Sequence, residues 1–261
     1  MKKFILAGFL LLWAAISFAS TPDFSAEFQG KSGCFILFDL TKNKLIQDYN
    51  PSRCAQQIPA DSTFKVPLSL MAFDQKLITQ QTVFKWDGKD RGLPQWNHDQ
   101  TPQTWLTNSV VWVSQELTPQ LGLNKIKAYL KAFNYGNQDF SGGLTTAWLG
   151  STLKISADEQ LNFVKALVNH QLPVSQEAMT STKANMFLET TPKGYALYGK
   201  TGSDSHDQLQ EGWFIGFMTK GPQTYLIVSN FTDLLPTKTD QAGGPRAKAI
   251  VESLLTQMGL F

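Results

Sequence analysis

The chain has few of the residues that bind metals. Only three histidines occur among 261 residues, His98, His170 and His206, and they stand far apart. The sequence contains no His-x-His, His-Glu-x-x-His or Cys-x-x-Cys spacing, which are the patterns of zinc sites. We therefore expect no metal site, and a zinc hydrolase is disfavoured.

Long apolar runs are also missing, except at the N-terminus. Lys2 and Lys3 precede an unbroken apolar run over residues 4–16, and small residues follow around Ala19. The run is shorter than the about 20 residues that span a bilayer, which argues against a membrane anchor. A basic start, a short apolar core and a small-residue end predict a cleavable signal peptide over residues 1–19. We expect a soluble, exported protein in the periplasm.

An excess of one charge is missing as well. The formal charge of +2 falls to 0 when the signal peptide leaves with Lys2 and Lys3. Without a basic cluster the chain has no counterion-release drive toward nucleic acid and no polybasic attraction to a membrane. We expect a small neutral or anionic molecule as the partner, with no nucleic acid and, after signal cleavage, no membrane. The oligomeric state stays open.

Cysteine is scarce, with Cys34 and Cys54 as the only copies. In an oxidising compartment an isolated pair often forms a bridge. The two lie near opposite ends of a predicted hairpin, which would bring them together. Two buried thiols remain the alternative, because the distance between the residues cannot be read from the sequence.

What the chain does contain is the composition of a packed globular protein. Charged residues are 17% and aromatic residues 12%, with 7 tryptophans and no repetitive segment. The mature length of roughly 240 residues suffices for one large core or two lobes. We predict a single catalytic domain over residues 20–261.

Strands are expected at both ends of the chain, with helices between them. Apolar runs predict strands at 34–40, 44–49, 195–200, 212–218 and 224–230. Helices are predicted after Thr118-Pro119, after the Ser156–Glu159 capping box and after Pro245. The fold class is therefore α/β of the α+β type: a mostly antiparallel sheet built from both termini and flanked by helices. The sheet lobe covers about 20–57 and 180–261, and an inserted all-helical lobe covers about 58–179.

The most informative motif is Ser62 followed three residues later by Lys65. Positions three apart lie on one face of a helix, so the amine would reach the hydroxyl. A serine attacks only if a base takes its proton, and a lysine is a base only when its charged form is disfavoured. The pair predicts acyl transfer through a serine ester; the alternative is a helix cap followed by a solvated lysine. Pro67 predicts that this first turn is irregular.

A second motif, Lys200-Thr201-Gly202, stands at the end of a predicted strand. Glycine there lets a ligand approach the backbone closely. The cation and the hydroxyl are suited to bind a carboxylate. An ordinary strand end with a surface lysine is the alternative.

Together, these motifs resemble those of the penicilloyl serine transferases, and among them the class D, oxacillinase-type β-lactamases. The resemblance covers essentially the whole mature chain, and it implies a β-lactamase/transpeptidase-like fold. It rests on Ser62-Thr63-Phe64-Lys65, Ser109-Val110-Val111, Tyr135-Gly136-Asn137, Trp148, Lys200-Thr201-Gly202, Gly212-Trp213-Phe214 and Arg246. The Tyr-Gly-Asn element discriminates, because class A relatives carry Ser-Asp-Asn in its place and this chain has no such triplet.

The resemblance implies how the acylation machinery is divided. Ser62 would be the nucleophile, and Lys65, carboxylated on its amine by carbon dioxide, the general base for acylation and deacylation. Trp148 would hold the carbamate, and Ser109 would relay a proton to the lactam nitrogen. The backbone N–H groups of Ser62 and Ser203 would form the oxyanion hole. No cofactor is implied besides carbon dioxide or bicarbonate.

The resemblance also implies how the substrate is bound. Lys200, Thr201 and Gly202 would meet the substrate's carboxylate, with Arg246 as a second cation and Val111 as an apolar contact. Low-dielectric walls near Lys65 would come from Phe64, Val66, Val111 and Trp148. The substrate would be a β-lactam; which penicillins, cephalosporins or carbapenems are turned over stays open.

Three functions remain in competition at this point. The first is hydrolysis of β-lactam antibiotics, which gives resistance. The second is a periplasmic D,D-peptidase or transpeptidase that forms the same ester. The third is a non-catalytic penicillin-sensing domain that stays acylated. The absence of a retained anchor and of a second domain favours hydrolysis.

Overall fold

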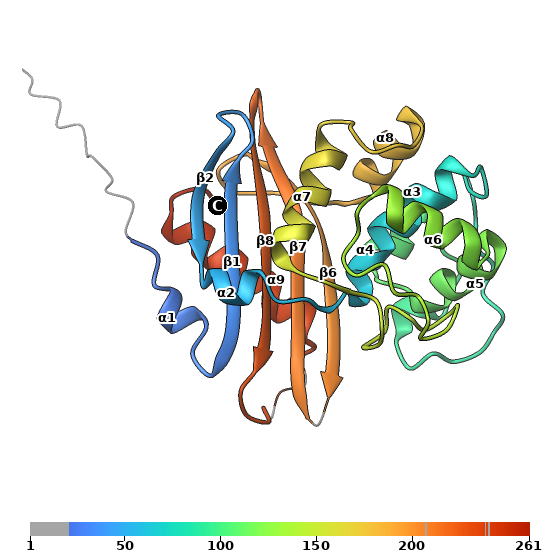
Figure 1. The fold of residues 1–261 in the computed structure, drawn as a ribbon, viewed down its shortest axis with the longest axis horizontal. Coiled ribbons are helices and arrows are strands. Elements are labelled where there is room, and N and C mark those ends of the chain that lie inside the picture. Colours follow the sequence, from blue (N-terminus) through green and yellow to red (C-terminus); the bar gives the residue numbers. More distant parts are fainter. Residues whose placement is uncertain (1–20, 207, 238, 240) are drawn as a thin grey trace, which may run out of the picture.

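The computed structural model describes residues 21–206, 208–237, 239 and 241–261 (Figure 1). The predicted signal peptide, residues 1–19, lies outside the described residues. Among the described helices, none has the length and the apolar character to cross a bilayer.

A six-stranded antiparallel sheet forms the centre of the molecule, in the order β2-β1-β8-β7-β6-β5 (Figure 1). The strands are β1 (Lys31–Asp39), β2 (Lys44–Tyr49), β5 (Phe187–Thr190), β6 (Ala196–His206), β7 (Leu209–Lys220) and β8 (Gln223–Asp233). A second, two-stranded sheet pairs β3 (Ile58–Pro59) with β4 (Lys154–Ile155). The predicted α/β fold with an antiparallel sheet built from both termini is confirmed.

The five predicted strands are present, and several are longer than their apolar runs. β6 and β7 stay paired out to His206 and Leu209, well past the apolar residues that signalled them. The additional strand β5 pairs with the start of β6. Polar residues extend these strands because ladder hydrogen bonds, and not burial alone, hold the hairpin.

Helices cover both faces of the sheet, and others gather to one side of it (Figure 1). The helices are α1 (Phe24–Glu27), α2 (Pro51–Cys54), α3 (Lys65–Asp74), α4 (Pro102–Thr107), α5 (Val111–Leu121), α6 (Leu123–Ala132), α7 (Ala157–Val168), α8 (Gln176–Asn185) and α9 (Gly243–Gln257). Two 3₁₀ turns, η1 (Asp61–Phe64) and η2 (Pro94–Trp96), join them. α9 packs against β6, β7 and β8, and α7 against β1, β7 and β8. The lobe boundaries remain a prediction; α7, which falls in the range predicted for the helical lobe, lies against the sheet.

Alternation along the strands divides the core between the two faces. Phe35 and Leu37 of β1 pack in the cluster that α9 covers, whereas Cys34 and Ile36 face the larger core on the helical side. This is the period-two pattern of a sheet buried on both faces.

The predicted helix start at Thr118-Pro119 is wrong. Both residues lie inside α5, and the next helix, α6, begins at Leu123 after Gly122. Leu117 and Leu121 are buried on one stripe of α5, so packing continues this helix past the proline. The break comes at Gly122, whose φ of 78° is the backbone conformation that glycine allows.

The other helix signals agree with the structure. Ser156 and Glu159 form a reciprocal capping box at the start of α7. Pro245 is the third residue of α9, within the first turn, where its missing N–H breaks no helical hydrogen bond. Cys34 of β1 and Cys54 of α2 form a disulfide with a Cα–Cα distance of 5.2 Å.

Candidate active site

Ser62 and Lys65 meet where η1 passes into α3. The Lys65 Nζ donates a hydrogen bond to the Ser62 Oγ at 3.0 Å, and the lysine is completely buried. The irregular first turn that Pro67 predicts is present as the 3₁₀ turn η1. Pro67 is the third residue of α3, so the amide it lacks would have had no intrahelical partner. The sequence spacing therefore yields the contact that acyl transfer needs.

Burial favours the neutral form of the Lys65 amine. It lowers the pKa of the amine from 10.5 to about 7, and the nearby Asp61 carboxyl opposes that shift. Among the described residues no carboxylate forms an ion pair with Lys65. A large fraction of neutral amine is thus present near pH 7, because an unpaired ammonium is costly in a dry interior.

Two buried polar atoms beside this motif have no hydrogen-bond partner among the described residues. One is Nε1 of Trp148, whose ring packs on Phe64 with centroids 5.2 Å apart. The other is Oδ2 of Asp61, the residue before Ser62. Buried polar groups nearly always have a hydrogen-bond partner. These two atoms are therefore able to hydrogen-bond a polar group placed beside them.

Asp61 is a site residue that sequence reasoning missed. It is 1% exposed, has a φ of 47°, and accepts a hydrogen bond from the Gly150 amide at 3.2 Å. Burial, followed by the charges of Glu211 and Asp204, raises the pKa of its carboxyl well above the usual value. The only sequence signal was its position directly before the candidate nucleophile.

Lys200 and Ser109 form a second contact across the cleft between β6 and the helices. The Lys200 Nζ donates to the Ser109 Oγ at 2.9 Å and to the Thr201 carbonyl at 2.8 Å. Burial, with the charge of Lys65 as a smaller cause, holds the pKa of Lys200 well below its usual value. Ser109 has a φ of 56°, so the turn between α4 and α5 presents its hydroxyl from a strained backbone. Val111 follows as the first residue of α5.

Gly202 lets β6 approach η1. A Cβ at this position would stand 3.2 Å from the Asp61 Cβ and 3.3 Å from the Thr63 Cγ2. The close approach brings the strand that carries Ser203 next to the turn that carries Ser62. Ser203 in turn accepts a hydrogen bond on its Oγ from the Gly244 amide at 2.7 Å, which ties β6 to the start of α9.

Arg246 is not brought to these residues. Its guanidinium hydrogen-bonds both carboxylate oxygens of Asp233 at 2.8 Å, and it lies 4.7 Å from the centre of the Phe231 ring. Gly244, two residues earlier, is the position of α9 that touches Thr201 and Gly202. Positions two apart point to nearly opposite sides of a helix, so Arg246 points away from Thr201 and Gly202 and toward Asp233 and Phe231 of β8.

The Tyr135-Gly136-Asn137 element supports the turn that carries Ser62. Tyr135 is buried, and Gln160 Nε2 donates to its hydroxyl at 3.4 Å and to the Thr63 Oγ1 at 2.9 Å. Gly136 has a φ of 53°, and a Cβ there would meet the Lys154 carbonyl at 2.0 Å. Gln160 is a second residue that sequence reasoning missed; it is a polar residue on the buried side of α7.

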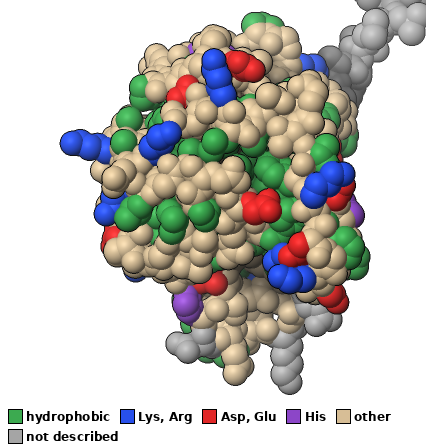
Figure 2. Space-filling model, turned by 90° about the vertical axis from the view of Figure 1, so that its right-hand side faces the viewer, with side chains coloured by type: hydrophobic (Ala, Val, Ile, Leu, Met, Phe, Trp, Pro, Cys, Tyr) green, Lys and Arg blue, Asp and Glu red, His purple; other side chains and the backbone are tan. Residues whose placement is uncertain are grey.

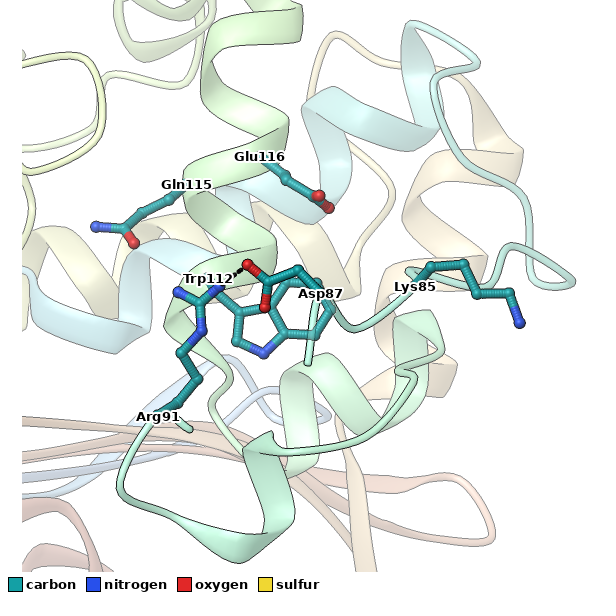
Figure 3. Close-up of a pocket in the computed structure, with 6 residues that line it drawn as sticks. All are labelled: Lys85, Asp87, Arg91, Trp112, Gln115 and Glu116. Carbon is teal, nitrogen blue, oxygen red and sulfur yellow. Dashed lines mark hydrogen bonds and ion pairs between the residues drawn. The ribbon is translucent and has the colours of Figure 1, made fainter. Parts of the chain in front are cut away.

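Two hollows lie near these residues. One, of about 180 Å³, adjoins the Lys-Thr-Gly strand and is lined by Leu106, Thr107, Leu188, Gly199, Lys200, Thr201, Pro245 and Lys248. The other, of about 260 Å³, is lined by Lys85, Asp87, Arg91, Trp112, Gln115 and Glu116 (Figure 3). Trp112 donates to the Trp96 carbonyl at 3.0 Å, and Trp96 to the Asn108 carbonyl at 2.9 Å. The second hollow therefore backs onto the turn that carries Ser109.

On the face shown in Figure 2, basic and acidic side chains are mixed with one another. Within the described part of the chain, no group of His, Cys, Asp and Glu residues is arranged to hold a metal ion.

A buried Ser–Lys pair facing a Lys-Thr-Gly strand, between a helical cluster and an antiparallel sheet, defines a penicillin-binding transpeptidase-type domain. The model of the penicillin binding protein transpeptidase domain matches residues 15–256. The chain is 48% identical to the β-lactamase OXA-1 of Escherichia coli over 237 residues, covering 87% of this chain and 86% of that protein. Within this domain family, the chain belongs to the class D β-lactamases, which are serine hydrolases.

Solved structures agree with this placement. The class D β-lactamase BAT-2 delta mutant superposes with a TM-score of 0.83 at 35% identity, covering 94% of this chain and 98% of that one. The C-terminal domain of the Bacillus licheniformis BlaR penicillin-receptor superposes with a TM-score of 0.85 at 30% identity, covering 92% and 96%. The same fold thus occurs in an enzyme class and in a receptor.

Proposed function

We propose that this protein hydrolyses β-lactam antibiotics through an acyl-enzyme on Ser62. The observation that carries the proposal is the buried Lys65 amine, 3.0 Å from the Ser62 Oγ, with a pKa lowered to about 7. A base of this pKa is matched to proton transfer at neutral pH. The β-lactamase names of the relatives support the choice of substrate.

In the first half-reaction, the Ser62 oxygen bonds to the lactam carbonyl carbon as the base on Lys65 takes its proton. The lactam C–N bond then breaks, and the nitrogen receives a proton through Ser109, which Lys200 holds at 2.9 Å. The amides of Ser62 and Ser203 stabilise the oxyanion; one such donor is worth about 3 kcal/mol. In the second half-reaction the base on Lys65 takes a proton from water, and the water oxygen bonds to the ester carbonyl carbon. The bond between that carbon and the Ser62 oxygen then breaks, and the proton passes to the Ser62 oxygen.

Carbon dioxide would add to the neutral Lys65 amine with release of a proton, and the carbamate anion formed would then serve as the base. The unpaired Trp148 Nε1 is a donor and would hydrogen-bond this anion. The unpaired Asp61 Oδ2 would donate a second hydrogen bond to it when the carboxyl is protonated. The low pKa of Lys65 favours the addition, because only the neutral amine reacts. Val66 and Phe64, both buried, keep the surroundings dry.

The ring carboxylate of the substrate would bind at Lys200 and Thr201, beside the hollow that both residues line. Arg246 was predicted as a second cation there, but it engages Asp233. Secretion to the periplasm through a signal peptide over residues 1–19 is also part of this proposal and rests on the sequence pattern alone.

A penicillin sensor is the second candidate, favoured by the likeness to the BlaR receptor domain. A sensor forms the same ester but does not hydrolyse it. A turnover assay with a chromogenic cephalosporin separates the two, together with mass spectrometry of Ser62. Hydrolysis over many turnovers, lost in Ser62→Ala, supports the enzyme. One stoichiometric burst with a lasting adduct on Ser62 would identify a sensor, and no adduct at all would reject both.

A further inference from the structure

The orientation of a bound β-lactam along β6 follows from its covalent structure, given the proposed function. The lactam carbonyl lies at the amides of Ser62 and Ser203. Its nitrogen side leads to the ring carboxylate, at Lys200 and Thr201. Its other side, the carbon that bears the acylamino substituent, must therefore continue along β6 beyond Ser203. The next residue is Asp204.

Alternation places Asp204 on the catalytic face of the strand. Lys200 and Gly202 face Ser109 and Asp61, and side chains two apart share a face. Asp204 is thus on the same face, and its cross-strand partner Glu211 stands directly opposite on β7. Its carboxylate packs on the turn at Gly150, where a Cβ would be 2.3 Å from the Asp204 Oδ2. The β6–β7 hairpin extends past the sheet at this end (Figure 1).

Three carboxyl groups lie close together at this end of β6. Asp61, Asp204 and Glu211 are close enough for the second and third to perturb the ionisation of the first. Among the described residues, the only ion pair to any of the three is from His206, whose Nε2 lies 2.9 Å from the Asp204 Oδ2 and whose side chain is 70% exposed. Arg53 interacts electrostatically with Glu211, but its hydrogen bonds go to Asn230, Gln56 and Thr232.

The three carboxyls differ in exposure. Burial raises the pKa of Asp61 well above its usual value and that of Glu211 to about 7, so both are partly or largely neutral near pH 7. Oε1 of Glu211, directly opposite Asp204, is buried and has no hydrogen-bond partner among the described residues. Asp204, whose side chain is 23% exposed, is the member of the cluster that a substrate can reach.

We propose that Asp204, backed by Glu211, makes the acyl-substituent end of the cleft selective for β-lactams whose acyl side chain carries a protonated amine. The ammonium would lie beside the Asp204 carboxylate as its counter-charge. Aminopenicillins and the matching aminocephalosporins are the substrate class that this chemistry describes.

The test compares two penicillins that differ by one amine, ampicillin and benzylpenicillin. Both are assayed with the same preparation, and the readout is the ratio of their kcat/KM values. That ratio does not depend on how much of a variant has folded. Asp204→Asn is expected to lower the ampicillin-to-benzylpenicillin ratio about three- to tenfold, the effect of losing a partly buried charge pair. Asp204→Lys is expected to lower it further, through repulsion of the ammonium.

Ser205→Ala, the next residue on the opposite face of β6, is the matched control and should leave the ratio unchanged. An unchanged ratio in both Asp204 variants would overturn the proposal, and so would equal losses for the two penicillins. Failure of the proposed function itself looks different, because the unaltered protein would then hydrolyse neither penicillin.

Discussion

Two cations on opposite sides of the sheet, Lys65 and Arg246, differ in how their charge is paired. On the catalytic side, Lys65 is wholly buried, and a serine hydroxyl is its hydrogen-bond acceptor. On the other side, Arg246 is 13% exposed and engages Asp233, 1% exposed, through two hydrogen bonds of 2.8 Å. One cation lacks a counter-charge, and the other has a bidentate one.

The difference decides what each cation does. Without a carboxylate partner the pKa of Lys65 falls to about 7, so a large part of its amine is neutral near pH 7, at the cost of stability. Arg246 is hydrogen-bonded to Asp233 and fastens the start of α9 to the end of β8. A buried cation is thus reactive or structural according to whether its charge is paired.

The largest effect is expected from Lys65→Met. Turnover of a β-lactam should fall about 10⁴-fold, because Ser62 loses the base that activates it. Stability should not fall, because an unpaired buried ammonium is replaced by an apolar chain of similar length. Steady-state kinetics and urea unfolding at pH 7 measure the two quantities.

The pH dependence of stability sharpens the same test. The lysine has a pKa of about 7 when folded and 10.5 as the reference value, so the unfolded chain binds more protons between these values. The free energy of unfolding should therefore gain a Lys65 contribution as pH rises through this window. That contribution should vanish in Lys65→Met, and exposed Lys131→Met should retain it. If Lys65→Met lost stability and kept its turnover, Lys65 would be a structural residue and not the base.

The sequence predicted the catalytic contacts better than the carboxylate-binding cation. Ser62 and Lys65 are local, three residues apart, so helical geometry alone brings them together. To place Arg246 correctly, one must know which side of α9 faces β6. A shift of two residues along the helix points a side chain to the opposite side. Only the packing of Gly243 and Gly244 against β6 and β7 determines it.

The same contrast holds for the fold. Short apolar runs identified the five strands, but not the polar continuation of β6 to His206, which depends on pairing with β7. The proline at 119 was a plausible helix start in isolation, yet buried neighbours extend α5 through it. Asp61 and Gln160 gave no periodic signal, because their importance lies in partners that are distant along the chain.

The second largest effect is expected on the other side of the sheet. Arg246→Met should lower the free energy of unfolding by about 3–5 kcal/mol, because it leaves the buried Asp233 carboxylate without its partner. The KM for a penicillin should change little, since Lys200 and Thr201 are the residues that line the hollow beside the site. Urea unfolding and steady-state kinetics on the folded variant provide both values.

Asp233→Asn is the matched control, because it breaks the same pair from the other end. Equal stability losses in the two variants, with activity retained, would establish the pair as structural. A large rise in KM in Arg246→Met alone would instead return Arg246 to the substrate's carboxylate and remove the contrast between the two cations.

The smallest effect, and the most specific to Lys65, is the response to carbon dioxide. In carbon-dioxide-depleted buffer at pH 7 we expect turnover to fall about tenfold and to return when bicarbonate is added, because carbamate forms only on the neutral amine. With a pKa of about 7, that neutral fraction falls about fivefold between pH 7 and pH 6. Carbamate formation also releases a proton, so the carbon dioxide concentration for half-maximal turnover should rise by more than this factor over the same interval. The Arg246→Met variant should show the same dependence as the unaltered protein, since its cation is on the far side of the sheet. Turnover that ignores carbon dioxide at both pH values would leave the amine itself as the base.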